Sequence, residues 1–112
     1  MGHLITPEFE ELFEKYPTGS QRELEDPLVI AKLFDQFSPA TWFLLEYDKQ
    51  FNIALAYVVG IYQDEPGSVN IKNLEKIIFT LIGKPKIKQD FNFTKKPLSE
   101  ALKVYREEQK IA

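Results

Sequence analysis

The sequence predicts an α+β fold: an antiparallel sheet of about four or five strands, with an N-terminal helix and two further helices packed on it. Two long apolar segments, residues 40–47 and 51–62, are separated only by the polar link at residues 48–50, which predicts a β-hairpin. Apolar residues recur at helical spacing both before and after these segments along the chain. A hairpin this apolar must be covered, and the predicted helices are the elements that can cover it.

The first predicted helix begins with three favourable residues. Thr6 suits the N-cap, Pro7 suits the first helical position, and Glu8 lies where the positive end of the helix dipole favours an acid. A buried face is predicted from four apolar residues at helical spacing, Phe9, Leu12, Phe13 and Tyr16. Pro17 ends this helix, and residues 18–27 read as a polar loop.

The strands follow. Residues 28–34 predict a first strand, ahead of the hairpin. In the second hairpin segment both alternating faces are largely apolar, and one carries the small residues Ala54, Ala56 and Gly60. A strand of this kind is covered on one side by bulky packing and approached closely on the other. Trp42, the one tryptophan, is expected in the core.

The last third of the chain predicts shorter elements. Residues 64–67, Asp-Glu-Pro-Gly, are typical of a type II turn, and residues 68–71 of a short strand. A helix is expected from about residue 73 to residue 81, stopped by Gly83 and Pro85. Residues 86–88 and 91–93 alternate like strands. A final helix is expected to begin near Pro97. Its inward face would carry Leu98, Ala101, Leu102 and Tyr105.

Length and composition limit the number of domains and the kinds of functional site that the chain can have. The chain has 112 residues, which predicts one domain over residues 1–112. It has no cysteine and one histidine, His3, which excludes disulfides, thiolate zinc sites, cysteine nucleophiles and metal sites with several histidines. We therefore predict no metal site and no cofactor. The lack of cysteine fits a reducing cytoplasm.

Hydropathy predicts a protein that stays out of the membrane. No apolar run approaches the roughly 20 residues that a membrane-spanning helix needs. Four glutamates within residues 8–14 occupy the place where a signal peptide has its apolar core. We expect a cytoplasmic location.

Charge is unevenly distributed along the chain. Net charge is −3, but residues 1–50 hold ten acids and four bases, giving −6, whereas residues 51–112 hold seven acids and ten bases, giving +3. Acidic residues of the first half are candidates for binding a protein partner: Glu8, Glu11, Glu14 and Glu23. The alternative is that they form an ordinary solvated surface.

A second candidate site is basic and aromatic. Five lysines fall within thirteen residues, with Phe91 and Phe93 among them: Lys84, Lys86, Lys88, Lys95 and Lys96. Such a pattern can hold phosphates and stack on bases, so this segment predicts binding of nucleic acid or of a protein partner. The alternative is an edge strand protected by lysines, with both phenylalanines pointing inward.

The sequence supports an enzymatic function less well than a binding function. A metal-dependent nuclease would need clustered carboxylates, for which Asp64 and Glu65 are the best available pair, but this pair is more typical of a turn. The five glycines are scattered, so no phosphate-binding loop is predicted. We expect no enzymatic activity and assign no catalytic residue.

The order of these landmarks resembles a family of bacterial, phage and plasmid proteins, the domain-of-unknown-function family 2958. The residues that carry the resemblance run from Leu4 to Leu102, and the most specific are residues 57–60 (Tyr-Val-Val-Gly) and 96–99 (Lys-Pro-Leu-Ser). Lys49 and Gln50 depart from the more acidic hairpin link expected of the family. The resemblance provides no catalytic residues. It implies a protein of mobile elements, sometimes encoded near antirestriction or DNA-processing genes.

Together these observations predict a non-catalytic binding protein of a phage, plasmid or other mobile element. Its partner would be a host or element-encoded protein, such as a nuclease or another DNA-processing factor. The alternative is direct nucleic-acid binding through residues 84–96.

Overall fold

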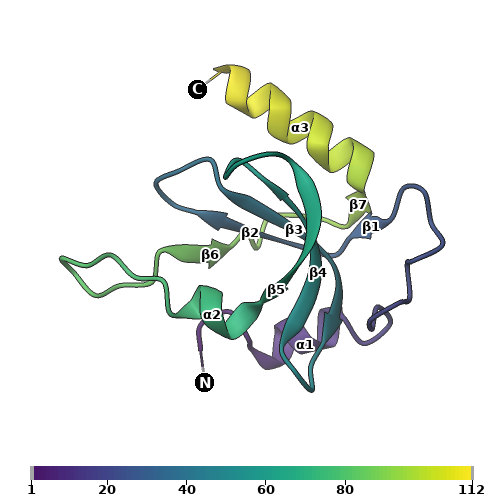
Figure 1. Cartoon of the computed structure of the whole chain (residues 1–112), viewed down its shortest axis with the longest axis horizontal. Coiled ribbons are helices and arrows are strands. Elements are labelled where there is room, and N and C mark those ends of the chain that lie inside the picture. The colour runs from purple at the N-terminus through teal and green to yellow at the C-terminus, as the bar shows by residue number, and fades with distance from the viewer. Residues whose placement is uncertain (1, 112) are drawn as a thin grey trace.

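A five-stranded antiparallel sheet forms the centre of the protein in a computed structural model that describes residues 2–111 (Figure 1). Its strands, in the order β5-β4-β3-β2-β6, are β2 (Ala31–Asp35), β3 (Thr41–Asp48), β4 (Ile53–Val59), β5 (Glu65–Asn70) and β6 (Ile87–Gln89). A second sheet pairs β1 (Leu28–Val29) with β7 (Lys96–Pro97). The helices are α1 (Pro7–Leu12), α2 (Ile71–Glu75) and α3 (Leu98–Ile111). The predicted α+β fold class is confirmed.

The helices lie on opposite faces of the sheet (Figure 1). On one face, Phe9 of α1 and Leu74 of α2 join a core with Leu33, Leu44 and other strand residues. On the other face, α3 contributes Ala101 and Tyr105 to a smaller core that contains Phe43 and Val59. Ala54 and Ala56 are fully buried, as their small size predicted.

The predicted hairpin is the longest strand pair of the sheet. β3 pairs with β4 from Thr41 opposite Val59 to Asp48 opposite Ile53, and Trp42 is buried as predicted. The register shifts between Leu44 and Glu46, so Leu45 is the extra residue of a β-bulge. Leu45 therefore joins the core under α3, while Leu44 faces the core under α1.

The first predicted strand, residues 28–34, divides between two sheets. Leu28 lies opposite Pro97 in β7, whereas Ala31 lies opposite Leu44 in β3. Ile30 lies between the two strands and donates its amide to the Leu44 carbonyl at 2.8 Å. Local alternation cannot reveal this division because the partner β7 is almost 70 residues away.

The predicted type II turn at residues 64–67 is wrong. Glu65 to Asn70 form β5, and the chain reverses earlier, where Gly60 adopts a φ of +79°. Pro66 lies within β5 and is tolerated there because β5 is an edge strand of the sheet, so its missing amide proton leaves no partner unpaired.

The helix predicted over residues 73–81 is also wrong beyond its first turn. α2 begins at Ile71, with the Asn70 side chain accepting from the Asn73 amide at 3.3 Å, and it ends at Glu75. The following residues pair with the chain that returns to β6, because the Lys86 amide donates to the Ile77 carbonyl at 2.9 Å. Gly83, with a φ of +66°, completes the reversal.

Two other elements follow the predictions more closely. α1 is capped by Thr6 as expected, because the Phe9 amide donates to its hydroxyl at 3.1 Å, but the helix ends at Leu12 and not near Tyr16. α3 begins at Leu98 and buries Ala101 and Tyr105, as predicted.

The loop at residues 18–27 is fixed to the β-bulge by buried polar groups. The Glu46 carboxylate, only 3% exposed, accepts the Gly19 amide at 2.7 Å and the Gln21 amide at 2.9 Å. The Gln21 side chain, also buried, exchanges hydrogen bonds with the Leu28 backbone and donates to the Leu45 carbonyl at 2.8 Å. A loop without regular secondary structure is thereby ordered.

Candidate binding groove

A groove of about 830 Å³ lies between α1 and the segment of residues 89–95. We call it the α1 groove. Its lining residues are Glu8, Phe9, Glu11, Leu12, Glu14, Lys15, Tyr16, Ile30, Gln89, Asp90, Phe91, Phe93, Thr94 and Lys95. Its two sides come from parts of the chain about 80 residues apart, so the folded sheet is required to form it.

The first wall of the α1 groove is acidic. Glu8, Glu11 and Glu14 recur every third residue, which places them on one side of α1 and of the turn that follows it. All three are exposed. Three of the four predicted acidic candidates are thus brought together on one surface. The fourth, Glu23, lies in the loop at residues 18–27 and does not line the groove.

Aromatic packing holds this wall in position. Phe9 and Phe13 lie on the buried side of α1, and the Phe9 and Tyr47 ring centroids are 5.0 Å apart. Asn52 donates to the Tyr47 hydroxyl at 2.7 Å, and burial is the main cause that raises the pKa of Tyr47. Tyr47 stays neutral and anchors α1 to β3.

The second wall is a series of turns and not the predicted strand at residues 91–93. Asp90 leaves β6 by donating its amide to the Lys32 carbonyl at 2.9 Å, and its side chain accepts the Asn92 amide at 2.9 Å. This Asx turn points Phe91 outward, with 79% of its surface exposed, while Phe93 packs against the core under α3. The alternative in which both rings point inward is therefore wrong for Phe91.

Lys95 also lines the α1 groove, where it contacts Tyr16. Its ammonium lies 5.5 Å from the centre of the Tyr16 ring, within the range of a cation–π contact. The groove consequently combines an acidic wall, an apolar floor that includes buried Phe9 and Ile30, and an exposed aromatic ring at its rim.

The five predicted lysines do not gather on one surface. Lys84 lies beyond Gly83 in the segment that leads to β6, Lys86 pairs with Asp35 at 3.3 Å, and Lys88 is an exposed residue of β6. Lys95 lies in the α1 groove, whereas Lys96 lies over the Phe93 ring, at 5.1 Å, in a hollow beside α3. The lysines thus point to several separate parts of the molecule.

Carboxylates near the ends of the strands have local partners. Asp64 lies 3.9 Å from Arg106 of α3, and Glu65 accepts from the Gln63 side chain at 3.1 Å. His3 donates its ring N–H to the Ile87 carbonyl. Within residues 2–111, no three His, Cys, Asp or Glu side chains lie close enough together to hold a metal ion.

Sequence reasoning identified the acidic wall but missed what faces it. Tyr16 was expected on the core-facing side of the helix, and it is half-buried against that core while its ring lies under Lys95. Phe91 was considered both as a stacking ring and as a buried one, and it is exposed. The Asp90-Phe91-Asn92 sequence contained a usable signal, because aspartate and asparagine one residue apart are typical of a turn.

No helix in the described part of the chain is long and apolar enough to cross a membrane.

Comparison with known proteins gives a match to one protein-family model. No curated protein and no solved structure matches the chain significantly. A protein-family model, described as "Protein of unknown function (DUF2958)", matches residues 4–112. Because that match covers essentially the whole sequence, the chain belongs to the DUF2958 family.

Proposed function

We propose that this protein is a non-catalytic binding protein, and that its α1 groove holds a basic, partly apolar segment of another protein. One observation supports the proposal most strongly: three glutamates from one side of α1 and of the turn after it line a groove with a hydrophobic floor. Apolar side chains of a partner would contact Leu12 and Phe91, which are exposed in the groove, and its lysines or arginines would lie beside the glutamates.

The biological setting is part of the same proposal. We infer that the protein is cytoplasmic and belongs to a phage, plasmid or other mobile element. Its partner would be a host or element-encoded protein, with nucleases and other DNA-processing factors as the first classes to test. An anti-defence or antirestriction role would follow if such a factor were inhibited. Support for this setting comes from the family resemblance and not from the groove itself.

Affinity capture from host lysate, read by mass spectrometry, tests the proposal. The wild-type protein would be compared with E11K/E14K, which reverses the charge of two groove glutamates and leaves Glu8 to favour the N-terminus of α1. The matched control is E25K/E107K, two exposed glutamates outside the groove with the same change in net charge. Each lysate would be divided and half of it treated with nuclease.

We expect a partner that survives nuclease treatment, that binds wild type and E25K/E107K, and that is lost with E11K/E14K. Partners that disappear with nuclease would identify nucleic acid as the ligand and favour the alternative site at residues 84–96. A nuclease-resistant partner that binds all three proteins equally would show that the groove is not the binding site.

A further inference from the structure

Residues 77–86 form an ordered projection that we call the 77–86 hairpin. The Phe79 amide donates to the Lys84 carbonyl at 3.0 Å, and the Gly83 amide donates to the Phe79 carbonyl at 2.7 Å. A further bridge pairs Ile78 with Pro85. Figure 1 shows this green segment extending away from the sheet, between α2 and β6.

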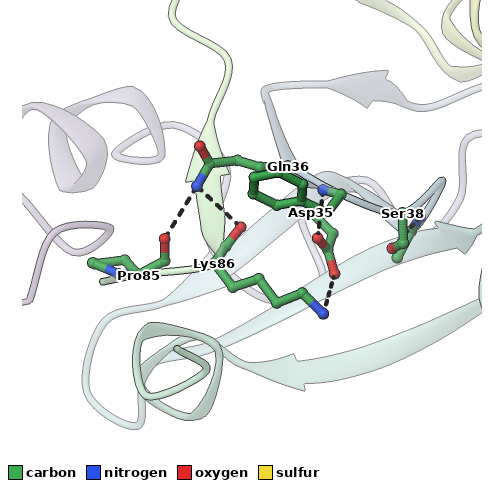
Figure 2. A network of polar contacts seen from close by, with 7 residues as sticks. Asp35, Gln36, Ser38, Pro85 and Lys86 are labelled. Atoms are coloured by element: carbon green, nitrogen blue, oxygen red, sulfur yellow. Dashed lines mark hydrogen bonds and ion pairs between the residues drawn. The ribbon is translucent and has the colours of Figure 1, made fainter. Parts of the chain in front are cut away.

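The base of the 77–86 hairpin is fixed to the end of β2. Gln36 donates from its side chain to the Pro85 carbonyl at 3.1 Å, and the Lys86 ammonium lies 3.3 Å from the Asp35 carboxylate (Figure 2). The Phe37 and Phe79 rings pack edge to face with their centroids 4.5 Å apart. The projection is therefore held in one orientation before it meets any partner.

The Asp35 carboxylate remains ionised in this network. Partial burial raises its pKa, but hydrogen bonds from the Phe37 amide, Ser38 and Lys86, together with the charge of Lys86, outweigh burial and leave the pKa below its usual value. The ion pair at the hairpin base is consequently present at neutral pH.

The tip of the 77–86 hairpin is apolar and exposed. Leu81 is 99% exposed and Ile82 is 63% exposed, and Ile78 is about half exposed. Lys76 and Lys84, both exposed, flank these side chains. Exposed apolar residues gathered on a rigid projection are typical of a contact surface, and the flanking lysines favour an acidic partner surface.

The α1 groove has the complementary properties and lies at the other end of β6. The hairpin leads into β6 at Lys86, whereas the groove begins where β6 ends, at Gln89. β6 is an edge strand of the sheet. Two copies related by a two-fold axis beside β6 run antiparallel there, so the hairpin of each copy approaches the groove end of the other.

From this placement we propose that the protein self-associates, with the 77–86 hairpin of one copy inserting Leu81 and Ile82 into the α1 groove of a second copy. Lys84 would then lie beside the glutamates of α1. This inference rests on the proposed binding role of the groove, and it makes a second copy of the chain a competitor of any other partner. Contacts of this size are weak, so assembly depends on protein concentration and on salt.

Sedimentation velocity over a concentration series tests the proposal with two variants. L81E removes the apolar tip, and its matched control is Y62E, which changes an equally exposed side chain elsewhere. E11K/E14K alters the groove, with E25K/E107K as its control. Leu81 is fully exposed, so L81E leaves the fold intact, which circular dichroism verifies.

We expect the mass of wild type, Y62E and E25K/E107K to rise above the 13.0 kDa of one chain as concentration increases. L81E and E11K/E14K would each stay at the mass of one chain. An equimolar mixture of these two variants would form a 1:1 pair, because one intact hairpin still meets one intact groove. High salt would reduce assembly of the wild type.

Either of two results would overturn the proposal: a wild type that remains a single chain at every concentration, or an oligomer that both variants leave intact. The capture experiment remains informative in each case. Loss of a captured partner with E11K/E14K but not with L81E would support the groove as a binding site even if no self-association occurs.

Discussion

At the scale of single residues, the buried carboxylate of Glu46 has a structural role. It has no basic partner among the ion pairs of the described residues and is held by two backbone amides, those of Gly19 and Gln21. Together with Gln21 it replaces the regular hydrogen bonds that the loop at residues 18–27 lacks. In the sequence Glu46 was simply one acid in an apolar strand, because its partners lie more than 20 residues away.

Replacing Glu46 by alanine should therefore destabilise the protein. E46A leaves the partly buried Gly19 amide and the buried Gln21 amide without an acceptor, and the buried amide alone should lower the free energy of unfolding by about 1–3 kcal/mol. Urea denaturation followed by Trp42 fluorescence measures this. The control E23A, in the exposed part of the same loop, should change it by less than about 0.5 kcal/mol. Equal stabilities for E46A and wild type would mean that water satisfies both amides.

At the scale of elements, α3 depends on a cap from a distant loop. Asp26 accepts the Ser99 amide at 2.9 Å and the Ser99 hydroxyl at 2.6 Å, so it satisfies one amide in the first turn of a helix that begins 72 residues later. The Ser99 hydroxyl, followed by the Ser99 amide, lowers the pKa of Asp26 below its usual 3.8. The loop at residues 18–27 is thus tied to α3 as well as to β3.

The Asp26 cap predicts a contribution to stability at acid pH. Because its folded-state pKa is lowered, this contribution is complete above pH 3.8 and is lost as pH falls through the lower folded-state value. D26A should melt at a lower temperature than wild type at neutral pH. D26N keeps a capping side chain, so it should melt close to wild type while losing less stability between pH 4 and pH 2.

Melting temperatures measured over that pH range for the three proteins provide the comparison. If D26N and wild type lose stability in parallel, the ionised form of Asp26 does not contribute to capping, and the acid sensitivity arises from other carboxylates.

Element prediction succeeded where the signal was local. The Thr6 cap, the hairpin of β3 and β4, and the inward face of α3 follow from neighbouring residues alone. The predictions at residues 64–67 and 73–81 were wrong because backbone pairing with a neighbouring segment overrides the turn and helix preferences of these residues. β5 exists because β4 is available to pair with it, and the hydrogen bond from Lys86 to Ile77 ends the helix that residues 73–81 favour.

Only one wall of the α1 groove could be predicted, because only that wall depends on neighbouring residues in the sequence. Helical spacing of Glu8, Glu11 and Glu14 is visible in the sequence, so the acidic wall could be inferred. The facing wall at residues 89–95 approaches α1 only through pairing of β6 with β2. The spread of the five lysines likewise follows from this pairing and from the Asp35 ion pair.

At the scale of the whole molecule, the sheet separates two hydrophobic cores that share its strands. Trp42 belongs to the core under α1, whereas Phe43, the next residue, belongs to the core under α3. Adjacent side chains of one strand therefore contribute to both cores, so loss of β3 would destroy both.

We predict that residues 1–112 unfold as a single cooperative domain. Trp42 fluorescence reports the core under α1, and far-UV circular dichroism reports mainly α3, the longest helix, on the other face. Their thermal and urea transitions should coincide. Earlier melting of the helical signal would instead show that α3 and the β1–β7 sheet form a separate unit.

The β-bulge at Leu45 changes which residues of β3 face α1. Up to Leu44, even-numbered residues face α1; after the extra residue, odd-numbered Tyr47 does so, and Glu46 faces the loop that needs its carboxylate. Deleting Leu45 would restore simple alternation with Glu46 still opposite Leu55, but it would remove a side chain from the core under α3 and the carbonyl that accepts from Gln21. Another apolar residue at position 45 would keep that backbone carbonyl, whereas a deletion removes it, so the number of residues in β3 is more tightly constrained than the identity of this one.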